Sequence, residues 1–129
     1  MPVKKLLLAA AILAMAPAAA FAADQSGTWL INAAFDSMGI KYVATCVLKD
    51  DGTGKLSGPC HIDMGDPSAA SDPVATGSVS GTAFDLAYDT TYQGTPVHLD
   101  YKGAVGSDGT VTGTIDTGGP QGTFTASKK

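Results

Sequence analysis

Apolar and polar residues alternate along most of the chain with a period of two, as in β-strands that bury one face. Trp29, Ile31 and Phe35 mark the apolar face of the first such segment. We expect strands at residues 28–35, 40–49, 55–60, 74–80, 84–89, 97–105, 111–115 and 122–126. Because most connections between them are short, the pattern predicts an all-β protein, an antiparallel up-and-down β-barrel of about eight strands.

Glycines recur within this pattern. The sequence Gly, any residue, aliphatic, Ser or Thr, Gly occurs at 54–58, 77–81 and 109–113. A glycine inside a strand marks a bulge, a bend or a close approach of two backbones, and a small barrel needs such positions to close. A phosphate-binding loop would need a helix after the glycines, and no helix is predicted there.

The N-terminal segment follows a different pattern. Two lysines precede an apolar run over residues 6–15, and an A-x-A site follows at 20–22, which is typical of a secretory signal peptide. A proline interrupts the run before the roughly 20 apolar residues that a spanning helix needs. We expect cleavage after Ala22, so that 1–22 is the signal peptide and 23–129 is a single soluble β-barrel domain. The location is then periplasmic or secreted.

Composition narrows the classes of partner. Without the two lysines of the signal peptide, the chain has six lysines against twelve aspartates, a formal charge of −6, and it contains neither Glu nor Arg. Nucleic acids and anionic membrane surfaces bind clustered positive charge, so we expect neither as a partner. A membrane-spanning barrel needs an apolar outer band and strands of about 9 to 11 residues. Most strands predicted here are shorter and polar on the opposite face, so we expect no membrane span.

The apolar faces of the strands must share one interior. A barrel of eight strands is just wide enough to be filled by its own side chains or to hold one small ligand. The segments 90–94 and 63–73 are expected to form a rim over one mouth of the barrel. The residues expected to line the interior and contact a ligand are Trp29, Phe35, Tyr42, Phe84, Tyr88, Leu99 and Tyr101.

Gly27-Thr28-Trp29, at the start of the first predicted strand, resembles the G-x-W signature of lipocalins and other calycin-type barrels. This resemblance implies a small barrel that binds a ligand, with Trp29 closing one end. In that family a basic residue near the last strand packs across the Trp, and Lys128 is the candidate by position. The family's usual helix before the final strand is not present in this sequence. Trp29 is also explained as a core aromatic residue of any β-fold.

Cys46 and Cys60 are the only cysteines, and a pair in an exported chain most often forms a disulfide. A four-residue turn at 50–53 would place Cys46 opposite Ser57 and Cys60 on the other face. The bond therefore requires a different register or a bulge, for example at a neighbouring glycine.

Two other functions were weighed from the sequence, metal binding and catalysis. Cys60, His61 and Met64 lie within five positions, and sulfur and nitrogen donors of this kind suit copper, although a disulfide would remove the thiolate. Catalysis has less support, because the chain has two histidines, no Glu and no nucleophile motif. His98 fits a solvated polar strand face. We expect no enzyme activity, no cofactor and no resident metal.

The leading functional hypothesis is that an exported barrel binds a small, largely apolar molecule in its interior. The alternative is a barrel with a filled core that acts as an envelope structural or protein-interaction module, without an identified protein partner. Copper-type binding at Cys60, His61 and Met64 is the third hypothesis. The first two differ in whether the interior contains a cavity of a few hundred Å³.

Overall fold

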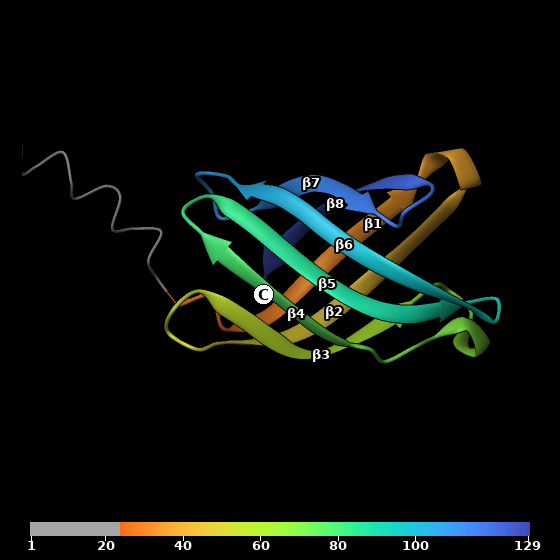
Figure 1. The fold of residues 1–129 in the computed structure, drawn as a ribbon, viewed down its shortest axis with the longest axis horizontal. Helices are drawn as coiled ribbons and strands as arrows, with labels where there is room; N and C mark the ends of the chain where they lie inside the picture. The colour runs from red at the N-terminus through yellow and green to blue at the C-terminus, as the bar shows by residue number, and fades with distance from the viewer. Residues whose placement is uncertain (1–23) are drawn as a thin grey trace, which may run out of the picture.

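The computed structural model describes residues 24–129, so the predicted signal peptide and its cleavage site lie outside the described residues. Figure 1 shows eight strands that wrap obliquely around one axis. The strands are β1 (Gly27–Phe35), β2 (Ile40–Asp50), β3 (Lys55–Asp63), β4 (Val74–Ser80), β5 (Ala83–Tyr92), β6 (Thr95–Val105), β7 (Val111–Asp116) and β8 (Gln121–Lys128). Two short 3-10 turns, η2 (Asp36–Met38) and η3 (Pro67–Ala69), lie in connections.

Each strand pairs antiparallel with the next, and β1 also pairs with β8, which closes the barrel. The predicted all-β, up-and-down, calycin-like barrel of eight strands is therefore confirmed. Several strands are longer than predicted, and the largest extensions are those of β3 to Asp63, of β5 to Tyr92 and of β8 to Lys128. In the β3 extension exposed His61 and Asp63 flank buried Ile62, and in the β5 extension exposed Thr91 lies between half-buried Thr90 and Tyr92, so the alternation of exposure continues although the composition resembles that of a loop.

The up-and-down order places alternate connections at the same end of the barrel. The connections β1–β2, β3–β4, β5–β6 and β7–β8 lie at one end, which we call the mouth, on the right in Figure 1. The first described residues, the connections β2–β3, β4–β5 and β6–β7, and the C-terminus lie at the other end, which we call the base. Segments far apart in sequence therefore meet at each end.

Aromatic side chains fill the base half of the interior. Trp29 lies against Phe84 with ring centroids 5.6 Å apart, and Phe84 lies 6.2 Å from Phe124. The series continues to Tyr101, edge-on at 5.2 Å, and then to Tyr88 at 5.5 Å. All five side chains are buried, and burial of such large apolar rings is the main stabilising contribution in a small barrel.

Glycine allows the backbones of neighbouring strands to approach closely. A Cβ on Gly113 would lie 2.0 Å from the carbonyl oxygen of Lys102, and a Cβ on Gly77 would lie 2.0 Å from that of Asp85. These distances are far inside van der Waals contact, so only glycine fits. The repeat thus marks close approaches as predicted. In its middle copy the order of turn glycine and strand glycine is reversed, because Gly77 lies in the strand and Gly81 in the turn.

A disulfide joins Cys46 to Cys60, as predicted. The two residues lie directly opposite each other on β2 and β3. The four-residue turn considered from the sequence is wrong, because five residues separate the partners Asp50 and Leu56. The backbone amide of Asp51 bonds the carbonyl oxygen of Lys55 across this longer turn. The register of the β2–β3 pairing is the same on both sides of Gly58, so no bulge there shifts it. The longer turn is what brings both sulfurs to the inner face.

Trp29 closes the base. Its indole Nε1 donates a hydrogen bond of 2.9 Å to the carbonyl oxygen of Gln25. Lys128 lies opposite Trp29 in the β1–β8 pairing, and its Nζ donates to the carbonyl oxygen of Asp24 at 3.1 Å. The aliphatic part of Lys128 covers Gly27, 3.1 Å from where a Cβ would be. The first described residues are therefore tied across the base by both side chains.

The outward positions of the strands carry mostly Thr, Ser, Asp and Lys, and no polar or charged residue among the described residues is buried. Within residues 24–129, no helix is both long enough and apolar enough to cross a membrane.

Candidate functional site: a cavity at the mouth of the barrel

A cavity of about 440 Å³ occupies the mouth of the barrel. All four mouth connections or the strand ends beside them contribute to its lining, from Met38 after β1 to Pro120 before β8. Phe35, Ile62 and Leu99 form buried apolar wall. The packed aromatic residues of the base stop short of this volume, so the interior is filled at one end and hollow at the other.

The lining of the cavity is almost free of charge. Hydroxyls of Thr90, Thr91 and Thr117 lie at its rim. His98 is the one titratable side chain other than tyrosine in the described lining, and it is largely exposed. Its Nδ1 lies 2.7 Å from Asp89, its partner on β5. The cavity therefore offers apolar contact and neutral hydrogen-bonding groups, with no buried ion to pair a charged ligand.

Three tyrosine hydroxyls meet inside the barrel, and one of the three residues, Tyr42, also lines the cavity. The hydroxyls of Tyr42 and Tyr101 are 2.6 Å apart, and the Tyr88 hydroxyl also bonds that of Tyr101. Tyr42 lines the cavity, whereas Tyr88 and Tyr101 lie behind it. Burial raises the pKa of all three hydroxyls above the ordinary tyrosine value, so the cluster is fully protonated at neutral pH.

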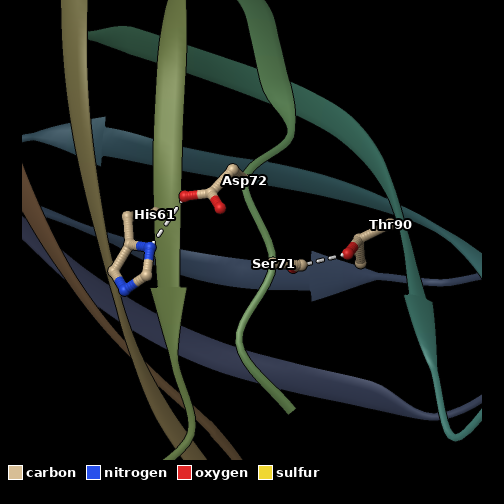
Figure 2. Close-up of polar contacts among 4 residues, drawn as sticks. All are labelled: His61, Ser71, Asp72 and Thr90. Atoms are coloured by element: carbon tan, nitrogen blue, oxygen red, sulfur yellow. Dashed lines mark hydrogen bonds and ion pairs between the residues drawn. The ribbon is translucent and has the colours of Figure 1, made fainter. Parts of the chain in front are cut away.

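Residues 64–73, the connection between β3 and β4, form a strap along one side of the mouth (Figure 2). Ser71 pairs with Ile62 through backbone hydrogen bonds, and its hydroxyl lies 2.8 Å from that of Thr90 on β5. On the outer surface, a carboxylate oxygen of Asp72 lies 2.8 Å from Nδ1 of His61. The pairing of β4 with β5 stops at Thr76 and Ala87, so the mouth half of β5 has backbone pairing with β6 alone. The strap lies beside the unpaired edge of this half.

The structure buries all seven residues that the sequence predicted for the interior, but it separates them into three groups. Phe35, Tyr42 and Leu99 line the cavity. Tyr88 and Tyr101 support Tyr42 from behind through the hydroxyl cluster. Trp29 and Phe84 lie in the base, away from the cavity, because the aromatic series fills that end. The first group holds the strongest candidates for ligand contact.

Sequence reasoning identified the rim segments 90–94 and 63–73 but missed two others. Met38 and Ile40 from the β1–β2 connection, and residues 117–120 from the β7–β8 connection, also line the cavity. The order of the strands could have predicted them, because alternate connections of an up-and-down barrel lie at the same end. Once one odd-numbered connection is assigned to the mouth, all connections that follow odd-numbered strands lie there.

The proposed copper ligands are not brought together. Cys60 is bonded to Cys46, so its thiolate is not free. His61 lies on the outer face with Asp72, whereas Met64 contributes to the cavity. Within residues 24–129, no group of three or more His, Cys or Asp side chains is arranged to hold a metal ion.

A second depression, of about 690 Å³, lies on the outer wall of β1, β2, β7 and β8. Its outward-facing lining includes Asn32, Lys41 and Thr125, all exposed. It is larger but lies open on the polar surface, so the mouth cavity is the better candidate site.

Comparison with protein families, with curated proteins and with solved structures finds no match to this chain. The resemblance to calycin-type barrels therefore depends on Gly27-Thr28-Trp29 and on the architecture alone.

Proposed function

We propose that this protein is an exported binding protein that holds one small, largely apolar molecule in the mouth of its barrel. The observation that carries the proposal is the apolar cavity of about 440 Å³ above a packed base. Ligand sites in proteins are typically clefts of roughly 300–1,000 Å³ with apolar walls and a few polar groups. A barrel whose only task was structural would gain stability from filling this space.

Two observations support export to the periplasm or beyond. The Cys46–Cys60 disulfide is typical of oxidising compartments. The N-terminal sequence has the charge, the apolar run and the small-residue site of a signal peptide.

A binding role is favoured over a catalytic one by the position of the histidines. His61 and His98 both lie largely exposed, and each is bonded to a neighbouring aspartate. Neither is placed beside a hydroxyl nucleophile within the cavity among the described contacts. The filled base favours a second candidate, a structural or interaction module, in which the mouth cavity holds only water.

Native mass spectrometry of the mature protein from its own host tests the proposal. We expect a reproducible small-molecule adduct that is lost on denaturation. In parallel, a neutral fluorescent probe, N-phenyl-1-naphthylamine, is expected to bind the purified, ligand-free protein. Absence of both the adduct and probe binding would contradict the proposal and favour the structural module.

Two matched variants locate the probe. Val97 and Val105 are half-buried residues of β6 at opposite ends of the barrel, and only Val97 lines the cavity. Val97→Trp should fill the cavity and weaken probe binding at least tenfold. Val105→Trp should leave probe binding unchanged. Equal effects of the two substitutions would show that the probe binds elsewhere.

A further inference from the structure

Aspartates gather at the mouth of the barrel, whereas lysines gather at its base. Within residues 24–129, the mouth half carries six aspartates and one lysine, Lys41, a formal charge of −5 with the histidines neutral. The base half carries five aspartates and five lysines, a formal charge of zero. The remaining aspartate, Asp100, lies near the middle of β6. The mouth therefore holds almost all of the excess negative charge.

The six aspartates of the mouth, which we call the rim aspartates, surround the opening of the cavity. All six are exposed, and five of them are next in sequence to a residue that lines the cavity. These five are Asp36, Asp63, Asp72, Asp89 and Asp116, beside the lining residues Phe35, Met64, Ser71, Thr90 and Thr117. The sixth, Asp66, lies in the strap. Because they come from the β1–β2 connection, β3, the strap, β5 and β7, they act on the opening from several sides.

An apolar cavity with a negative rim discriminates between ligands by the sign of their charge. Like charges around a cleft with low-dielectric walls reinforce one another, so the rim attracts cations and repels anions. An ion inside the cavity would lose its hydration without gaining a partner, so the charged group of a ligand must stay at the rim. Tyr92, the last residue of β5, also lines the cavity and is half-buried. The face of a tyrosine ring attracts a cation independently of the carboxylates.

We propose that the ligand is an amphiphilic cation, whose apolar body contacts Phe35, Ile62 and Leu99 while its ammonium group stays at the rim, among the rim aspartates and against the ring of Tyr92. This inference rests on the proposed function. It names the chemical class of the ligand and the groups that select it.

Three probes with one apolar body test the proposal by displacement of N-phenyl-1-naphthylamine. They are 2-naphthylmethyl-trimethylammonium, its neutral isostere 2-neopentylnaphthalene, and 2-naphthylmethanesulfonate. Raising the NaCl concentration from about 0.05 M to about 0.5 M screens the rim, so the cation should bind about three- to fivefold more weakly. The sulfonate should bind more tightly at the higher concentration, because its repulsion is screened. Binding of the neutral isostere, which reports apolar contact alone, should not weaken.

Two matched double variants locate the charges that act. The rim variant is Asp63→Asn with Asp116→Asn, and the base variant is Asp51→Asn with Asp108→Asn. Each of these four carboxylates accepts a hydrogen bond from a backbone amide two positions further on, so both variants alter the same local contact. At about 0.1 M salt the rim variant should weaken cation binding about twofold, because charge effects fade over roughly 10 Å. The base variant should not weaken it.

The contribution of Tyr92 is measured by the ratio of the affinities for the cation and for the neutral isostere, which cancels the loss of apolar contact. Tyr92→Leu should lower this ratio about two- to fivefold, the value of an exposed cation–ring contact. Tyr92→Phe keeps the ring and should leave the ratio unchanged. Circular dichroism and urea unfolding confirm that every variant is folded before its affinities are compared.

The outcomes separate this inference from the proposed function. If neither N-phenyl-1-naphthylamine nor any of the three probes binds the wild-type protein, both proposals fail. If the neutral isostere binds and the cation shows the same salt dependence, the cavity binds apolar molecules but the cationic class is wrong. Tightest binding of the sulfonate at low salt, or equal weakening of cation binding by the rim and base variants, would also overturn it. An unchanged ratio in Tyr92→Leu would show that Tyr92 does not contact the ammonium group.

Discussion

Trp29 and Lys128 are direct partners in the pairing of β1 with β8 that closes the barrel. Both face the interior side of the wall, but Trp29 is buried whereas Lys128 is exposed at the end of the barrel. Each hydrogen-bonds a carbonyl oxygen of the first described residues, Gln25 and Asp24 respectively. This arrangement covers the base with backbone from the N-terminal side.

Trp29→Ala is expected to destabilise the fold by about 3–5 kcal/mol, because it removes the ring that packs on Phe84 and leaves a cavity. Urea unfolding followed by circular dichroism measures the change. Trp29→Phe retains a ring but loses the indole hydrogen bond, so its cost should be smaller. An unchanged free energy of unfolding in Trp29→Ala would contradict a core role for this residue.

Breaking the Cys46–Cys60 bond should lower stability by about 3 kcal/mol, since the bond joins residues 14 apart and restricts the unfolded chain. The measurement is the urea midpoint with and without dithiothreitol. The double variant Cys46→Ala, Cys60→Ala serves as control, because its midpoint should not respond to the reductant. An equal response in both proteins would mean that the reductant acts elsewhere.

Gly113→Ala should destabilise the barrel by about 1–3 kcal/mol or more, because the added methyl group would overlap the Lys102 carbonyl oxygen of β6. Gly119→Ala is the control. Its Cβ would approach only the Thr117 hydroxyl, at 3.9 Å, in the mouth connection. Thermal unfolding compares the two variants, and similar melting temperatures would argue against the close approach of β6 and β7.

Asp85 on β5 should reduce stability at neutral pH. Its burial and the neighbouring Asp100 raise the pKa of this carboxyl, so folding favours its neutral form. The free energy of unfolding therefore falls as the pH rises from below the ordinary pKa of aspartate through the raised pKa of Asp85. Asp85→Asn is therefore expected to be more stable than wild type at pH 7, with the gain vanishing near pH 3.

Asp108→Asn provides the opposite case for the same pH series. The Thr110 backbone hydrogen bond lowers the pKa of Asp108, so its ionised form stabilises the fold at neutral pH, and that contribution is lost as pH falls. This variant should be less stable than wild type at pH 7 and equal to it at low pH. Parallel curves for the two variants would refute both assignments.

The Ser71–Thr90 hydrogen bond should control local opening of the strap. In Ser71→Ala, amide exchange at Ile62 and Ser71 is expected to accelerate, while exchange in β1 stays unchanged. Hydrogen exchange followed by nuclear magnetic resonance measures both regions. Thr91→Ala, at the exposed neighbour of Thr90, is the control and should not accelerate exchange in the strap.

Alternation and short connections together predict the up-and-down strand order, and a period of two predicts the inward direction of Tyr42, Leu99 and Tyr101, because it records which face of a strand is buried. It cannot predict the register of Cys46 with Cys60, which depends on the length of one turn. It also cannot predict that three hydroxyls converge. That contact joins Tyr42 on β2 to β5 and β6, and it depends on the register of every strand pair between them.

The end of the β4–β5 pairing at Thr76 and Ala87 has a mechanical consequence. Beyond this point the wall is a seam, crossed by the side-chain bond between Ser71 and Thr90. Parting it would break the Ser71–Thr90 hydrogen bond, while the backbone ladders of β3 with β4 and of β5 with β6 would stay paired. We expect any widening of the mouth to begin along this line, because the backbone pairing of β4 with β5 is continuous at the base, from Thr76–Ala87 to Ser80–Ala83.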